Sequence, residues 1–212
     1  MKRPMSKGVA LVLAAVVGSG LAGCEQNRLG AAAVVEDHRI TVTEVQGYLD
    51  LVREQRAQFG LPTDLGPDAA RLEVERRVLD LVFDKAASDL GLVVTPADAQ
   101  ATRDADERSA EEIANLAAQN NVTLASLDEL FRRFTIERKI SESIKAEFPA
   151  ADDTQLQAVF SDRLVATAQS MDITINPRYG SFDSMSGQIQ PTQFDFLRAP
   201  AGGKGEPAQT AE

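Results

Sequence analysis

The spacing of hydrophobic residues predicts a short pair of strands followed by a series of amphipathic helices. Residues 32–35 and 38–41, joined by Glu36 and Asp37, have the length and turn of a strand–turn–strand. The next helix has Thr43 as a candidate N-cap and ends near Gly60. Its apolar positions fall on one helical face, as is typical of a helix packed on a core: Val45, Tyr48, Leu49, Val52 and Phe59.

Two further helices are predicted in the middle of the chain. Asp68 begins a helix whose apolar face ends at Leu90, and Gly91 is well placed as its C-cap. Thr95 then pairs a cap residue with Pro96 at the first helical position, so a third helix is expected over residues 97–119. Because alanine and charged residues dominate its sequence, we expect it to be exposed along most of its length.

A fourth helix carries the strongest apolar stripe. Ser126 and Glu129 have the spacing of a capping box at its start, and Pro149 ends it. The stripe consists of large side chains: Leu127, Leu130, Phe131, Phe134, Ile140, Ile144 and Phe148. The pattern alone leaves open whether this face is core or an open groove.

The last part of the chain combines a helix, a strand and a polar segment. A fifth helix is expected to start at Asp152 or Asp153, and residues 171–175 alternate as a strand does. Residues 184–212 are rich in Gly, Ser, Gln, Pro and Thr and have little to bury, which predicts a disordered tail. Phe194, Phe196 and Leu197 are its apolar exceptions.

The first 23 residues have the three zones of a secretory signal peptide. Lys2, Arg3 and Lys7 form a positive start, residues 8–22 are apolar or small, and small residues precede Cys24. The alternative is a transmembrane helix. Fifteen residues would span roughly 22 Å, however, and a bilayer core needs ~30 Å. We therefore expect residues 1–23 to be removed and residues 24–31 to act as a tether.

Leu21-Ala22-Gly23-Cys24 resembles the bacterial lipobox, in which the cysteine thiolate takes up the lipid. Cys24 is the only cysteine in the chain, which also excludes a disulfide within it. The sequence thus predicts a lipoprotein held on the extracytoplasmic side of the cell membrane by lipid on Cys24. Which membrane carries it in a cell with two is left open.

Replacing Cys24 by alanine should leave an unprocessed precursor or a soluble secreted form, because only this thiol can accept the lipid. Intact-mass measurement of the membrane fraction should show a chain that starts at Cys24 and carries acyl chains. A mature start elsewhere, or a mass without lipid, would contradict the lipoprotein prediction.

Composition and motifs narrow the function further. The chain has 32 acidic and 22 basic residues, a net charge of −10, which disfavours binding to nucleic acid. It contains no phosphate-binding loop, GxSxG or HExxH pattern after the signal. His38 is the single histidine, so a histidine dyad is excluded, and the acidic runs lie on a predicted helix and not on a calcium loop. We expect no enzyme activity, metal or cofactor.

Three segments follow one another in a recognisable order: Ile40-Thr41-Val42-Thr43-Glu44-Val45, the helix that begins at Arg71, and the turn Leu90-Gly91-Leu92-Val93-Val94-Thr95-Pro96. This order resembles the N-terminal chaperone domain of the SurA, parvulin-type foldase family. The resemblance covers residues 32–148 and extends to a closing strand at residues 173–180. It implies a mainly α, SurA N-terminal-like helical domain over residues 32–183, with a small β element that pairs the N- and C-terminal strands.

The chain departs from this family at one point. Its foldases insert a parvulin isomerase domain before the last helix, whereas here only Pro149-Ala150-Ala151 separates the helices. The resemblance therefore implies chaperone or holdase binding of unfolded or newly exported proteins, without isomerase activity. The candidate client-binding residues are Phe131, Phe134, Ile140, Ile144 and Phe148. The alternative is a structural or scaffold lipoprotein that binds one folded envelope partner. A solute-binding lipoprotein is disfavoured because it needs two α/β lobes.

Overall fold

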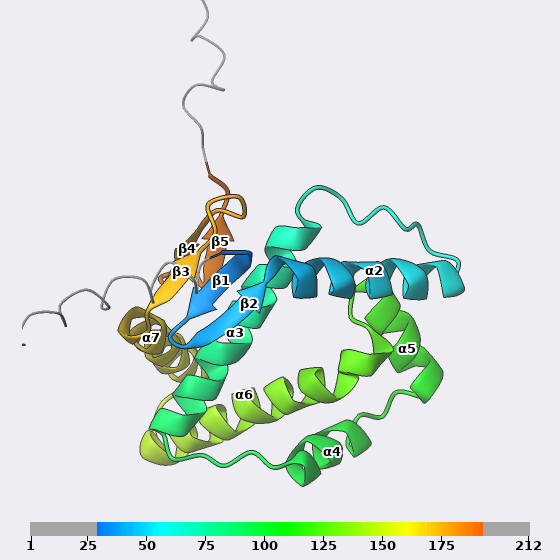
Figure 1. Cartoon of the computed structure of the whole chain (residues 1–212). Coiled ribbons are helices and arrows are strands. Elements are labelled where there is room, and N and C mark those ends of the chain that lie inside the picture. Colours follow the sequence, from blue (N-terminus) through cyan, green and yellow to red (C-terminus); the bar gives the residue numbers. More distant parts are fainter. Residues whose placement is uncertain (1–28, 193–212) are drawn as a thin grey trace, which may run out of the picture.

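The structure is a computed structural model that describes residues 29–192, and over this range the chain is mainly helical with a small antiparallel sheet (Figure 1). The expectations for the signal peptide, for Cys24 and for residues 193–212 lie outside the described residues. Between residues 29 and 192, no helix has the length and apolar character needed to cross a membrane.

The sheet joins the two ends of the described chain. β1 (Ala31–Val35) lies between β2 (His38–Thr41) and β3 (Ile173–Ile175) and is antiparallel to both. Val34 is opposite Arg39 on one side and Thr174 on the other. The predicted strand–turn–strand and its pairing with the C-terminal strand are therefore confirmed. Such short strands are not stable alone, so each depends on the others and on the helices behind them.

The first two helices pack on this sheet. α2 (Val42–Gln58) is capped by Thr41 and not by Thr43 as expected. Thr41 has the extended backbone that an N-cap needs, its hydroxyl accepts the Glu44 N–H at 3.1 Å, and the Glu44 carboxylate accepts the Thr41 N–H at 2.7 Å. α3 (Ala69–Asp89) follows, and Gly91 just beyond it has a positive φ of 66°, which fits the predicted C-cap.

The single helix expected over residues 97–119 is two helices, α4 (Pro96–Asp104) and α5 (Ala110–Gln119). Two side chains stop the first and start the second. Asp106 accepts the backbone N–H of Arg108 at 3.0 Å, and the Ser109 hydroxyl accepts the N–H of Glu112 at 3.2 Å. These local bonds offer the backbone an alternative to helix, which explains the break. The sequence signal for this break is the capping-box spacing of Ser109 and Glu112.

The remaining helices are α6 (Leu127–Glu147) and α7 (Asp153–Ser170), with the short 3₁₀ helix η1 (Leu124–Ser126) before α6. The predicted capping box at Ser126 is wrong, because the Ser126 hydroxyl donates to the Thr123 carbonyl at 3.0 Å and makes no bond to α6. Thr123 caps η1 instead. α6 ends before Pro149 and Asp152 caps α7, both as expected.

The disordered tail was expected from residue 184, and for residues 184–190 this is wrong. β4 (Ser181–Asp183) and β5 (Gln188–Gln190) form an antiparallel hairpin in which Ile189 is 1% exposed. α3 holds the hairpin, since Arg71 donates to the Ile189 carbonyl at 3.0 Å and Glu75 accepts the Ile189 N–H at 2.7 Å. A Cβ on Gly180 would lie 2.0 Å from the Gln190 carbonyl oxygen, so only glycine fits before β4.

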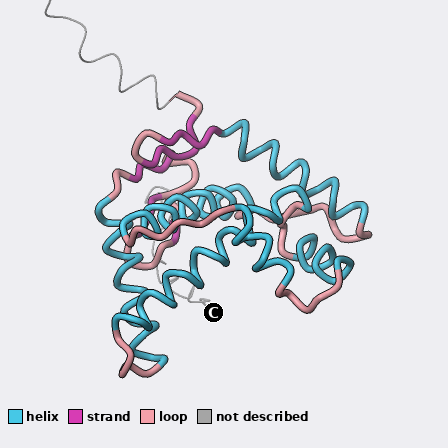
Figure 2. The backbone as a smooth tube through the Cα atoms, turned by 90° about the horizontal axis from the view of Figure 1, so that it is seen from below, coloured by secondary structure: helices cyan, strands magenta, loops and turns pink. Residues whose placement is uncertain are grey.

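Three apolar clusters hold the elements together. The first joins the sheet to α2 and α3, the second joins α3 to α6 and α7, and the third joins α5 to α6. The strands lie together at one end of the molecule and the helices extend away from them (Figure 2). α2 and α6 cross the molecule with α3 at one end and α5 at the other (Figure 1).

Candidate functional site

Three adjacent hollows surround the first half of α6. The α5–α6 groove has a volume of about 250 Å³, the α4–α6 hollow about 330 Å³, and the arginine cleft between β2, α3 and α6 about 420 Å³. Phe131 lines the first two, and Glu129 and Arg132 line the last two. The hollows therefore follow one another around the helix, from an apolar end to a charged end.

The α5–α6 groove is the apolar end. It is lined mainly by hydrophobic side chains: Ile113, Leu116, Ala117, Val122, Leu127, Leu130, Phe131 and Phe134. Phe134 is 38% exposed and Leu116 37%, and the Phe134 ring meets the Phe131 ring edge-on with centroids 6.1 Å apart. α5 buries only Ala117 and Ala118. Because these side chains are small, the helix covers the apolar face of α6 incompletely and the groove stays open.

The candidate client-binding residues divide between core and surface. Ile140 and Ile144 are 0% exposed and pack against α3 and α7, and Phe131 is 4% exposed in the floor of the groove. The assignment of Ile140 and Ile144 as open client-binding residues is wrong, because α3 and α7 already cover them, whereas Phe131 still lines the groove. Phe134 and Phe148 are both partly exposed, but only Phe134 lines the groove. A helical stripe shows which face is apolar but not which neighbouring helix covers each residue. The sequence therefore could not separate the core residues of the stripe from the exposed ones.

Polar contacts hold α4 on α6. The Thr102 hydroxyl lies 2.7 Å from that of the fully buried Thr135, and Lys139 lies 3.0 Å from Asp98. The Thr95 backbone N–H, followed by the Lys139 ammonium, lowers the pKa of Asp98 to about 2. Asp98 therefore stays ionised, and its pair with Lys139 persists, until the pH falls towards that value. The only buried residue of α4 is Ala99, which leaves the α4–α6 hollow beside it.

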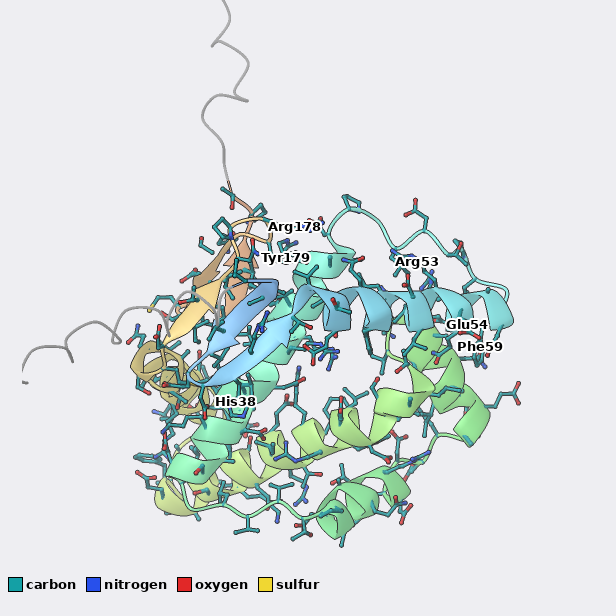
Figure 3. All side chains as sticks on the ribbon, viewed as in Figure 1. His38, Arg53, Glu54, Phe59, Arg178 and Tyr179 are labelled. Carbon is teal, nitrogen blue, oxygen red and sulfur yellow. The ribbon has the colours of Figure 1, made fainter. Side chains whose placement is uncertain are left out.

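The arginine cleft is the charged end. Five arginines from three elements line it: Arg39 of β2, Arg76 and Arg77 of α3, and Arg132 and Arg133 of α6. Three carboxylates share it: Asp80, Asp84 and Glu129. Figure 3 shows His38, another lining residue, at the end of β2 beside α3. Guanidinium groups thus outnumber carboxylates in the lining of the cleft, although Glu73 and Glu137 outside the lining pair with Arg76, Arg77 and Arg133.

Beneath the cleft lies a buried ion network. Glu73 is 5% exposed and accepts two hydrogen bonds of 2.9 Å from Arg76 and one of 2.6 Å from Arg77. Arg76 also pairs with Asp80 at 3.0 Å and lies over the Tyr48 ring, 5.0 Å from its centroid. Burial raises the pKa of Asp80 although Arg76 and Arg133 oppose the shift. The ion pairs lie within α3, and the contact between Arg76 and the Tyr48 ring links them to α2.

Other pairs link α3 to α6 across the cleft and leave guanidinium donors unused. Arg132 Nη1 donates to Asp84 at 2.6 Å, and Arg133 pairs with Asp80 at 3.5 Å. Over residues 29–192, Arg132 donates this one hydrogen bond, and Arg77 donates only one, from Nε to Glu73. The cleft was not predicted. Its signal in the sequence is the pair of doublets, Arg76-Arg77 and Arg132-Arg133, on two helices that the fold brings together.

His38 is the exposed first residue of β2, and its ring nitrogen Nδ1 lies 3.0 Å from the carboxylate of the neighbouring Asp37. Across residues 29–192, no three His, Cys, Asp or Glu side chains are grouped so as to hold a metal ion.

Comparison with known proteins gives no relative: no family model, no curated protein and no solved structure matches the chain.

Proposed function

We propose that this protein is a membrane-anchored, extracytoplasmic holdase that binds unfolded or newly exported proteins through the α5–α6 groove. The observation that carries the proposal is an apolar groove with Phe134 and Leu116 at its surface. Its volume of about 250 Å³ is below the roughly 300–1,000 Å³ of small-molecule sites, which favours side chains of a polypeptide as occupants. The lipid anchor on Cys24 and the resemblance to SurA-type chaperone domains are further parts of the proposal.

The groove alone would bind weakly. Burying one large apolar side chain contributes about 1.5–3 kcal/mol, part of which ordering the client offsets. A dissociation constant of 1 μM requires about 8 kcal/mol, so one or two side chains leave the affinity weaker than micromolar. Further contacts between the client and the adjacent α4–α6 hollow would bring the dissociation constant to tens of micromolar. Weak binding that depends on few side chains suits a holdase, because clients of many sequences can bind and leave.

Two matched substitutions, one on α6 and one at the residue that follows it, test the groove. Phe134 lines it and is 38% exposed, whereas Phe148 lies outside it and is 39% exposed. We expect Phe134→Asp to weaken binding of a fluorescent, permanently unfolded client roughly tenfold, because about 1.4 kcal/mol of apolar contact is lost. Phe148→Asp should leave the affinity nearly unchanged. Fluorescence anisotropy with the full chain carrying Cys24→Ala, which cannot be lipidated, measures both.

Circular dichroism must accompany the binding assay, since an aspartate at either site has to leave the fold intact for the comparison to hold. If both variants are folded and bind the client equally, the α5–α6 groove is not the client site. Capture of one folded envelope partner, with no affinity for unfolded chains, would replace the holdase by the scaffold alternative. The proposal also expects no acceleration of prolyl isomerisation in a test peptide.

A further inference from the structure

The arginine cleft has a chemistry that the holdase proposal does not use. We infer that it binds the carboxylate of an acidic side chain on the bound polypeptide, so that clients are selected by an apolar residue in the groove and an Asp or Glu in the cleft. This inference rests on the proposed function for its ligand, and the experiment below separates the two.

The cleft has the donors that a carboxylate needs. Its volume is about 420 Å³, and Arg77 and Arg132 face it from different helices with most of their N–H groups unused within residues 29–192. Guanidinium groups pair with carboxylates through parallel hydrogen bonds, which fix orientation as well as charge. In a chain with a net charge of −10, the guanidinium donors of Arg77 and Arg132 that are free within the described residues are the groups that would attract an acidic segment.

The cleft favours a singly charged carboxylate over a phosphate. Asp80, Asp84 and Glu129 line the same space, and a doubly charged ligand would meet repulsion from all three. Arg132 pairs with Asp84, and the two side chains are 46% and 39% exposed. Exposed pairs of this kind contribute little to stability, so an incoming carboxylate can replace Asp84 at small cost.

The position of the cleft sets the spacing in the client. The α5–α6 groove and the arginine cleft lie on different sides of α6 and are joined through residues of the α4–α6 hollow. A helix with its side chains is about 10–12 Å across, and an extended chain advances about 3.3 Å per residue. The acidic residue should therefore lie roughly three to five positions from the apolar one.

Three labelled peptides test this inference on the full chain carrying Cys24→Ala. The first has an apolar residue and a glutamate four positions apart, the second has glutamine in place of that glutamate, and the third has the glutamate in a Gly/Ser sequence. At low ionic strength the first should bind roughly fivefold tighter than the second, the range of an exposed ion pair. The Glu/Gln substitution changes the ligand alone, so this comparison does not depend on the folding of any variant.

Two protein variants then locate the effect. Arg132→Gln should abolish the preference for glutamate, whereas Arg138→Gln on the same helix should preserve it, because Arg138 is 48% exposed and does not line the cleft. Equal binding of the first two peptides, or equal effects of the two variants, overturns the inference. So does binding to anionic lipid vesicles that Arg132→Gln removes, since the cleft would then bind phosphate head groups. If the Gly/Ser peptide binds and the apolar Gln peptide does not, the holdase proposal fails and the cleft assignment stands.

Discussion

Replacing Ile140 by alanine should lower the free energy of unfolding by about 3 kcal/mol, the middle of the range for large-to-small core substitutions. Ile140 is 0% exposed in the cluster that joins α6 to α3 and α7, so the lost methyl groups leave a cavity that rigid neighbours cannot fill. Phe148→Ala is the matched control on the same stripe. Phe148 is 39% exposed, and we expect a loss below about 1 kcal/mol.

Urea unfolding followed by circular dichroism compares the two variants, and client binding is measured where both are folded. Ile140→Ala should bind clients as the wild type does, because its side chain does not reach the groove. Equal stability losses at the two positions would show that the α6 stripe is not divided into core and surface as described. A loss of client affinity in a stable, folded Ile140→Ala protein would show that Ile140 belongs to the client-binding site.

Replacing Glu73 by glutamine should lower the free energy of unfolding by about 2–3 kcal/mol. Breaking one partner of a buried ion pair costs about 3–5 kcal/mol, and the amide oxygen can retain one of the arginine hydrogen bonds. The Glu73 carboxylate accepts three hydrogen bonds from Arg76 and Arg77. The two arginine side chains are 25% and 29% exposed, so water can replace the lost hydrogen bonds only in part.

Asp50→Asn provides the control for Glu73. Asp50 pairs with Arg53 at 2.7 Å, but its side chain is 75% exposed, so the expected loss is below about 1 kcal/mol. Thermal unfolding of both variants at neutral pH gives the comparison. Similar losses would mean that Glu73 does not hold Arg76 and Arg77 in place. The arginines of the cleft would then lack the rigid base that the carboxylate site assumes.

The sequence predicted the helices where a cap and an apolar stripe agree. Thr95 with Pro96, Gly91 and Asp152 all mark the ends of elements that the structure contains. Pairing of the strands near Val34 and Thr174 could be predicted because neither is long enough to stand alone. At these helix ends and strands, a few neighbouring residues determine the local structure, so the sequence is enough to predict it.

Elsewhere the outcome depended on competing local bonds or on distant parts of the chain. Thr43 was expected to cap α2, but β2 ends at Thr41, and the extended backbone of Thr41 makes it the cap instead. The hairpin that contains Ile189 is held by hydrogen bonds with Arg71 and Glu75 of α3. The polar sequence of the hairpin itself does not predict these distant contacts. The burial of Ile140 and the exposure of Phe134 depend on which helix covers each, a property of tertiary packing and not of periodicity.

The most direct test of the holdase proposal is the affinity of the folded wild-type chain for unfolded proteins. Several unrelated, permanently unfolded clients should bind with dissociation constants of tens of micromolar, measured by fluorescence anisotropy, and native versions of the same proteins should not compete. Absence of binding to any unfolded client at these concentrations, by a chain shown to be folded, would contradict the proposal.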